Sequence, residues 1–146
     1  MTADTGEARL DQLLSSMKPF LRPSRYVFCR VEDQARLPLD RVVFFFREDE
    51  ALTVVLKESD AAELGLAYEF VCAWITLTVH SSLEAVGLTA VFAGALAAEG
   101  LSCNVVAGYY HDHIFVRYEN AAQTVAVLET LSHKYRRVAY DDLDYL

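Results

Sequence analysis

In the second half of the chain, the spacing of apolar residues changes from a strand period to a helix period. Residues 73–79 alternate apolar with polar or aromatic side chains, which is the pattern of a strand with one buried face. Residues 88–96 place apolar side chains at the spacing of a single helix face. Gly100 is suited to end this helix, because glycine adopts the left-handed conformation common at helix C-termini.

Alternation returns after this glycine. Residues 101–106 predict a second strand, residues 108–112 a turn and residues 113–117 a third strand. Asn120 is followed three residues later by a glutamine, as in a capping box, and a second amphipathic helix is predicted behind it. This half of the chain therefore has the element order β-α-β-β-α.

The first half predicts three strands and a short helix. The strands are expected at residues 26–31, 42–46 and 52–56, and a charged hairpin loop joins the second to the third. The uninterrupted phenylalanines at residues 44–46 predict a strand covered on both faces. Serine and glycine at the two ends of residues 59–65 predict one or two turns of helix.

These elements predict an α+β fold of two fused ferredoxin-like units of the βαββαβ type. Each unit has an antiparallel sheet with helices on one face. We expect an N-terminal unit at residues 1–67, which includes a short helix at residues 11–17, and a C-terminal unit at residues 68–146. The fourth strand of the C-terminal unit comes either from the first half of the chain or from residues 138–140.

The composition narrows the classes of function. Hydrophobic residues make up 53% of the 146 residues, which is enough for a sizeable core. The net charge of −8 repels phosphate backbones and anionic lipids, so neither nucleic acid nor a membrane is an expected partner. The three cysteines are widely spaced, which favours buried thiols in a reducing compartment over disulfides. A cytoplasmic protein is expected.

The loop between the first strand and the first helix of the second half carries candidate binding chemistry. A strand that turns at Gly87 into a helix gathers backbone N–H groups and a helix dipole, which attract a carboxylate. Glu84 is suited to an ammonium group, and Ser81 and Ser82 to neutral hydrogen bonds. The residues by themselves favour a second interpretation, in which Ser81 and Glu84 form a capping box and Gly87 only permits close packing.

Residues 75–131 resemble the ACT domain of aspartokinases. The likeness is carried by three segments: AVGLTA at residues 85–90, AAEGL at residues 97–101 and SCNVV at residues 102–106. Residues 74–84 are similar to small stand-alone proteins with two ACT units, most of them of uncharacterised function.

This resemblance implies a regulatory unit that binds an amino acid at an interface between units. In the family, the asparagine that matches Asn104 helps to hold the ligand. The alternative is an edge-strand residue whose amide bonds a neighbouring backbone. The resemblance also raises the binding-loop interpretation to equal standing with the capping-box interpretation. The predicted ligand-binding residues are His80, Ser81, Ser82, Glu84, Val86, Gly87, Leu88 and Asn104.

The predicted function is a small-molecule sensor, binding an amino acid, without catalytic activity of its own. The alternative is a structural or protein-interaction module that keeps the fold without a ligand. The strand face bearing Trp74 and Thr76 must meet the other unit or a second subunit, so a homodimer is expected.

No metal or cofactor is expected. His111 and His113 with Asp112 supply too few groups to coordinate a metal ion. They favour a solvated turn that makes at most a supporting contact to the bound amino acid. Cys72 and Cys103 lie in predicted apolar strands, where thiols are normally inert.

Overall fold

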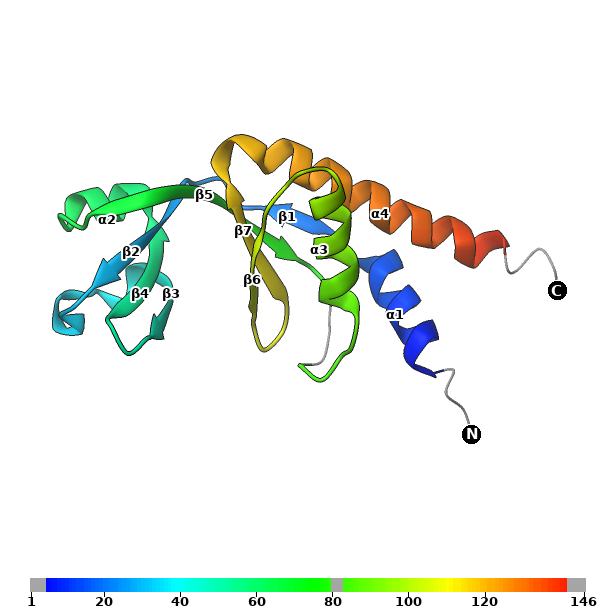
Figure 1. Ribbon diagram of the computed structural model, residues 1–146, viewed down its shortest axis with the longest axis horizontal. Coiled ribbons are helices and arrows are strands. Elements are labelled where there is room, and N and C mark those ends of the chain that lie inside the picture. Colours follow the sequence, from blue (N-terminus) through cyan, green and yellow to red (C-terminus); the bar gives the residue numbers. More distant parts are fainter. Residues whose placement is uncertain (1–4, 80–82, 142–146) are drawn as a thin grey trace.

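The computed structural model describes residues 5–79 and 83–141, which form one mixed sheet-and-helix body (Figure 1). Seven strands of this part join in one antiparallel sheet. The strands are β1 (Pro19–Leu21), β2 (Tyr26–Val31), β3 (Val42–Arg47), β4 (Leu52–Lys57), β5 (Tyr68–Leu77), β6 (Asn104–Ala107) and β7 (Asp112–Arg117). The helices are α1 (Thr5–Ser16), α2 (Glu58–Glu63), α3 (Leu88–Ala98) and α4 (Ala121–Asp141), with 3-10 turns η1 (Gln34–Arg36), η2 (Leu39–Arg41) and η3 (Tyr118–Asn120).

The second half forms a ferredoxin-like unit whose fourth strand comes from the first half. β5, β7 and β6 lie side by side, and β1 pairs with the free side of β5, Phe20 opposite Thr76. The spatial order β1-β5-β7-β6 is therefore fourth, first, third and second strand. Of the two sources predicted for the fourth strand, the C-terminal one is wrong, because α4 continues without a break through residues 138–140.

The first half forms a second unit with the same strand order. β5, β2, β4 and β3 follow one another, and the N-terminal half of β5 acts as the fourth strand. The ten-residue β5 is thus shared: Tyr26 and Arg117 flank Cys72 on its two sides, where one unit passes into the other. The division at residue 67 stays a prediction, while α1 and β1 pack with the second half of the chain.

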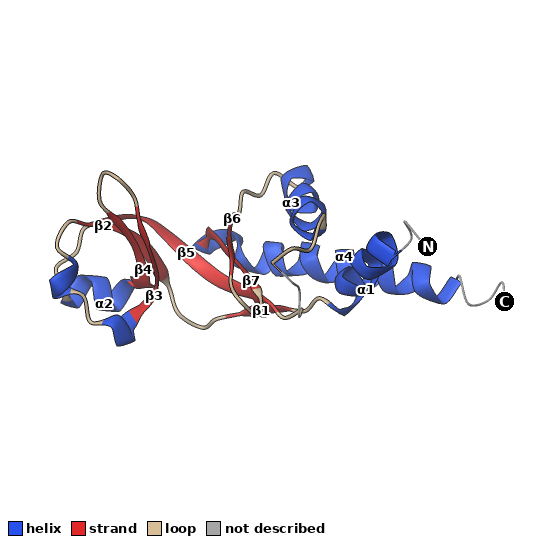
Figure 2. Cartoon of the chain, turned by 90° about the horizontal axis from the view of Figure 1, so that it is seen from below, coloured by secondary structure: helices blue, strands red, loops and turns tan. Residues whose placement is uncertain are grey.

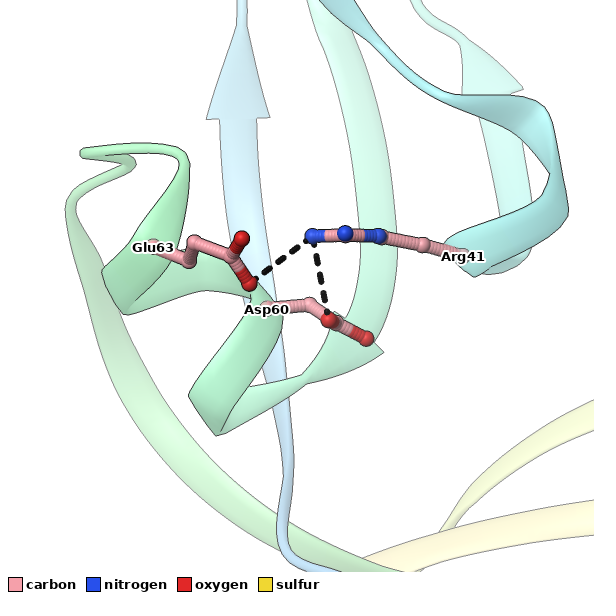
Figure 3. A network of polar contacts seen from close by, with 3 residues as sticks. All are labelled: Arg41, Asp60 and Glu63. Atoms are coloured by element: carbon pink, nitrogen blue, oxygen red, sulfur yellow. Dashed lines mark hydrogen bonds and ion pairs between the residues drawn. The ribbon is translucent and has the colours of Figure 1, made fainter.

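The first helix of this N-terminal unit is replaced by η1 and η2. Arg41, at the end of η2, holds this segment against α2 (Figure 3). Its Nη1 atom lies 2.9 Å from Oε2 of Glu63 and 3.5 Å from Oδ1 of Asp60. One cation between two carboxylates therefore joins a short 3-10 turn to the only α-helix described within residues 26–72.

All four helices lie on one face of the sheet, as the pattern predicts. The odd-numbered residues of β5 from Val71 to Leu77 point to this face, and the helices α1, α3 and α4 gather at one end of the molecule while α2 lies at the other (Figures 1 and 2). The buried core under α1, α3 and α4 includes Leu14, Met17, Ile75, Leu77, Phe92, Leu96, Ile114 and Leu128.

The opposite face of the sheet carries a cluster of aromatic rings that contact one another. Phe28, Phe44 and Phe115 come from β2, β3 and β7, and their ring centroids lie 5.4–6.1 Å apart. Trp74 on β5 meets Tyr26 edge-on at 5.4 Å. The sequence predicts that another unit or a second subunit covers the face bearing Trp74. The N-terminal unit of the same chain covers at least part of this face.

Two predictions about single strands are wrong. β3 is an edge strand, so Phe45 and Phe46 are 42% and 66% exposed instead of being covered on both faces. A run without alternation cannot show which strand lies at an edge. The strand predicted at residues 101–106 begins only at Asn104, because the backbone N–H of Leu101 is used to bond Leu96 at the end of α3.

Candidate functional site

The described part of the predicted binding loop is a solvent-exposed bend that leads into α3. Leu83 is 65% exposed and Val86 is 88% exposed, with exposed Glu84 between them. Leu88, the first residue of α3, is buried beneath the helix. An acidic side chain between two exposed apolar ones is suited to contact a small amphipathic molecule or a second protein surface.

Gly87 makes this bend possible. It is the N-cap of α3 with φ at +98°, a conformation that residues with a Cβ rarely adopt. A Cβ built on Gly87 would lie 3.1 Å from Cδ2 of Leu10 in α1, so this side of the glycine is filled by the protein itself. Gly87 therefore permits close packing against Leu10, and a ligand must approach the loop from another side.

Asn104 lies on the edge strand β6 and is exposed. Its Nδ2 atom donates to the backbone oxygen of Phe115 at 3.3 Å, so the amide bonds a neighbouring strand as the alternative interpretation has it. The hydrogen bonds of the described residues do not join Asn104 to the loop. His80, Ser81 and Ser82, the remaining predicted residues, lie outside the described part of the chain.

A polar cluster at the start of β7 lies close to the beginning of the loop. The Nδ1 atom of His111 is 3.1 Å from the backbone oxygen of Val79, one residue before His80, and as the ring atom facing a carbonyl it carries the proton. His113 lies on β7 opposite Thr76, and its Nδ1 atom is 3.0 Å from the indole Nε1 of Trp74. The predicted solvated turn is therefore tied to β5 by His113 and to the segment just after β5 by His111.

The hydrogen bond from Trp74 determines which nitrogen of the neutral His113 ring carries the proton. An indole N–H only donates, so Nδ1 of His113 must accept and the proton of the neutral ring is on Nε2. Burial, together with the positive charges of Arg22 and His111, lowers the pKa of His113 below its ordinary value. Burial raises the pKa of the neighbouring Asp112 carboxyl. His113 is thus a neutral hydrogen-bond donor through Nε2 at pH 7.

Arg22 is the residue of this cluster that the sequence analysis missed. It follows β1 in the chain, and its guanidinium carbon lies 4.8 Å from the Phe20 ring centroid and 4.4 Å from that of Trp74. Its Nη2 atom donates to Oγ1 of Thr76 at 3.2 Å, and its Nε atom is buried without a hydrogen-bond partner among the described residues. An isolated arginine beside two prolines gives no sequence signal, because β1 pairs with a strand more than fifty residues away.

Comparison with known proteins identifies the family. Models of the ACT domain match residues 5–73 and 69–130, one on each half of the chain. A Vibrio cholerae protein of unknown function, described as a possible transport protein, is 47% identical over 88% of this chain and 99% of its own, with a TM-score of 0.77. The chain belongs to the ACT-domain family.

More distant ACT-like structures share the fold alone. An Agrobacterium tumefaciens protein is 16% identical, covers 80% of this chain and 89% of its own, and has a TM-score of 0.65. The regulatory subunit of aspartate kinase from Thermus thermophilus, in its ligand-free form, is 10% identical over 77% of this chain and 95% of its own, with a TM-score of 0.56. The comparison with curated proteins finds no match. ACT domains in general are regulatory modules that bind ligands.

The cysteines of this ACT-domain protein are poorly suited to nucleophilic chemistry. Burial raises the pKa of Cys29, Cys72 and Cys103, that of Cys72 to about 12. The Cys72 thiol also donates to the backbone oxygen of Tyr26 at 3.3 Å. At neutral pH these thiols are protonated, and the thiol is a far weaker nucleophile than the thiolate.

The described part of this ACT-domain protein contains neither a candidate metal centre nor a candidate membrane-spanning helix. Within residues 5–79 and 83–141, histidine, cysteine and acidic side chains form no group of three that could hold a metal ion. The helices of the same residues lack the combination of length and apolar character that a membrane span requires.

Proposed function

We propose that this protein is a regulatory module that binds a free amino acid at the loop before α3 and has no catalytic activity of its own. The observation that carries the proposal is the bend of Leu83, Glu84 and Val86, which holds two exposed apolar side chains around a carboxylate at the N-terminus of a helix. The ligand-binding character of ACT domains in general supports it. A cytoplasmic location is part of this proposal.

The chemistry of the bend matches the two charges of an amino acid. The N-terminal turn of α3 carries backbone N–H groups and the positive end of the helix dipole, which favour the ligand carboxylate. Glu84 supplies the negative charge that an ammonium group needs. Leu83 and Val86 offer apolar surface to the ligand side chain, which favours an amino acid over a fully polar ion.

We further propose that the ligand is closed in by a second copy of the chain. An exposed bend covers only one side of a small molecule, whereas small-molecule sites normally bury most of the ligand surface. A homodimer in which the two bends face a shared ligand supplies the missing side and links binding to assembly.

Titration of the twenty amino acids, by calorimetry and by thermal shift, tests this proposal. At least one of them is expected to raise the melting temperature and to give saturable heat, and Glu84→Gln is expected to weaken its binding at least tenfold. Glu50→Gln, which removes the same charge from the exposed β3–β4 hairpin loop, serves as the control and leaves binding unchanged. Absence of a response to all twenty would refute the amino-acid function.

A second candidate function is a protein-interaction module without a ligand. The observation that favours it is β3, which lies at the edge of the sheet formed by the described strands and has Phe45 and Phe46 exposed. Light scattering of wild type and of Phe46→Ser distinguishes the two functions. Self-association that Phe46→Ser abolishes, in a protein that no amino acid stabilises, supports the interaction module.

A further inference from the structure

Arg22 has a buried guanidinium edge for which the protein provides only part of the hydrogen bonding. Nη2 bonds Thr76, but Nε is buried and has no partner among the described residues. Native proteins satisfy almost all buried polar groups, so such an atom requires an explanation. The ion pairs within the described residues engage Arg25, Arg30, Arg36 and Arg41, and none of them engages Arg22.

The side chain is nevertheless held in place. Ring contacts with Phe20 and Trp74 and the bond to Thr76 fix the guanidinium plane, and ring contacts leave the in-plane N–H groups as its means of binding. A positioned arginine that pairs with no carboxylate of the described residues, in a chain whose net charge is −8, is suited to bind a ligand anion.

His113 holds Trp74 in place beside the same threonine. Its Nδ1 atom lies 3.1 Å from Oγ1 of Thr76 and accepts from Trp74, so Nε2–H points to the other side of the ring. A Cβ on Gly108 would lie 2.9 Å from the backbone oxygen of His111 and 3.1 Å from this Nε2 atom, so the backbone of Gly108 packs closely against this side of the ring. The guanidinium of Arg22 beside a neutral imidazole offers a single positive charge with several N–H groups, which matches a singly charged carboxylate better than a doubly charged phosphate.

We infer that Arg22, Thr76, Trp74 and His113 form a second binding site, on the face of the sheet opposite α3, for the carboxylate of a small molecule. Arg22 provides the charge and the N–H groups, Trp74 holds the guanidinium through its ring face, and His113 holds Trp74 by accepting its indole N–H. This site is separate from the loop before α3, and it stands whether or not that loop binds an amino acid.

The single tryptophan of the chain reports directly on this site. We would follow the Trp74 indole N–H resonance during titration with sodium acetate at pH 7.5, where the neutral form of His113 predominates, holding ionic strength constant with sodium chloride. A saturable shift is expected, and Arg22→Gln should weaken the fitted affinity at least tenfold. Arg22→Lys keeps the charge but not the planar edge, and an intermediate affinity is expected for it.

Arg25→Gln is the matched control. Arg25 also carries one charge and lies over an aromatic ring, 4.5 Å from the centroid of Tyr118, but it pairs with Glu58. This variant should bind acetate as wild type does, and so should Glu84→Gln, whose altered charge belongs to the loop. Far-UV circular dichroism and the melting temperature establish that Arg22→Gln remains folded.

A shift of the indole resonance that does not saturate, or that persists unchanged in folded Arg22→Gln, overturns the proposal. An equal loss in Arg25→Gln overturns it as well, because only the overall charge would then matter. Tighter binding of sodium phosphate than of acetate refutes the assignment to a carboxylate. Failure of the amino-acid titration leaves these results untouched, since Arg22→Gln and Glu84→Gln report on different faces of the protein.

Discussion

At the scale of single residues, hydrogen-bond direction determines the charge state of the polar cluster. Trp74 can only donate, and this makes His113 accept at Nδ1 and keep its proton on Nε2. A second proton would have to enter at Nδ1, between the indole N–H and the hydroxyl of Thr76, and beside the charge of Arg22. Folding therefore opposes protonation of this histidine.

The stability of the protein should depend on pH through His113. Because the folded-state pKa of His113 is lowered from 6.5, the unfolded chain takes up the proton first as the pH falls. The stabilising contribution of the neutral imidazole is complete above about pH 6.5, and it is lost as the pH falls through the lowered value. The wild-type melting temperature should therefore fall between pH 7.5 and pH 5, when measured by differential scanning calorimetry.

His113→Asn is the matched variant, since its amide oxygen can accept from Trp74 and does not titrate. Its melting temperature should fall less over the same range. Asp112 acts in the opposite direction, because its raised pKa stabilises the protein at low pH and that contribution is lost as the pH rises through the raised value. Asp112 is present in both proteins, so identical pH profiles would contradict the role given to His113.

At the scale of elements, the start of α3 is defined by one glycine and one leucine. Gly87 turns the chain into the helix at a positive φ, and Leu10 of α1 fills the space that a Cβ would need. α1 thus supports the loop that we propose as the binding site, although it is far away in the sequence. Gly94, by contrast, lies inside α3 with open space around it.

The two glycines should respond to alanine in opposite directions. Gly87→Ala should lower the free energy of unfolding by about 1–2 kcal/mol for the left-handed backbone alone, with a further loss from the contact with Leu10. Gly94→Ala should raise it by about 0.5–1 kcal/mol, since glycine is a poor helix former. Urea unfolding monitored by circular dichroism measures both changes.

Leu10→Ala tests whether the contact with Leu10 contributes to the stability loss caused by Gly87→Ala. In that background, the loss caused by Gly87→Ala should be smaller, because the contact at 3.1 Å has been removed. Strictly additive losses would show that the leucine does not contribute, and a Gly87→Ala variant as stable as wild type would contradict the strained backbone.

At the scale of the whole molecule, the two ACT units share strands, so no single position in the sequence divides one from the other. β5 serves both sheets, and β1 crosses from the N-terminal part to complete the second unit. The aromatic cluster closes the joint, with Phe115 of the second unit in contact with Phe28 and Phe44 of the first. The two units should therefore unfold together.

Phe115→Ala tests this coupling. Its ring is fully buried between the units, so its removal should cost about 3–5 kcal/mol and lower amide protection in both units. Phe46→Ala, at an exposed position of β3, should change stability by less than about 0.5 kcal/mol. Hydrogen exchange that increases only in β7, while β2 and β4 keep their protection, would contradict a single cooperative body.

Local pattern predicted most of the elements, and it failed where partners are distant in the sequence. The alternation of residues 73–79 correctly placed Trp74 and Thr76 on the face opposite the helices. The same pattern could not distinguish edge from centre for Phe45 and Phe46, because exposure depends on whether another strand lies alongside. Arg22 gave no signal, since its chemistry arises only when β1 pairs with β5.

The sequence by itself determined the α+β class, the two ferredoxin-like units, the ACT family and the two faces of the strand at residues 73–79. These follow from periodicities and motifs that lie within short stretches of chain. Only the tertiary structure decided that β1 completes the second unit, that Leu10 occupies the space at Gly87, and that Arg22, Trp74 and His113 meet around Thr76. Such contacts depend on strand register and on the packing of distant segments, and no local spacing of residues encodes either of them.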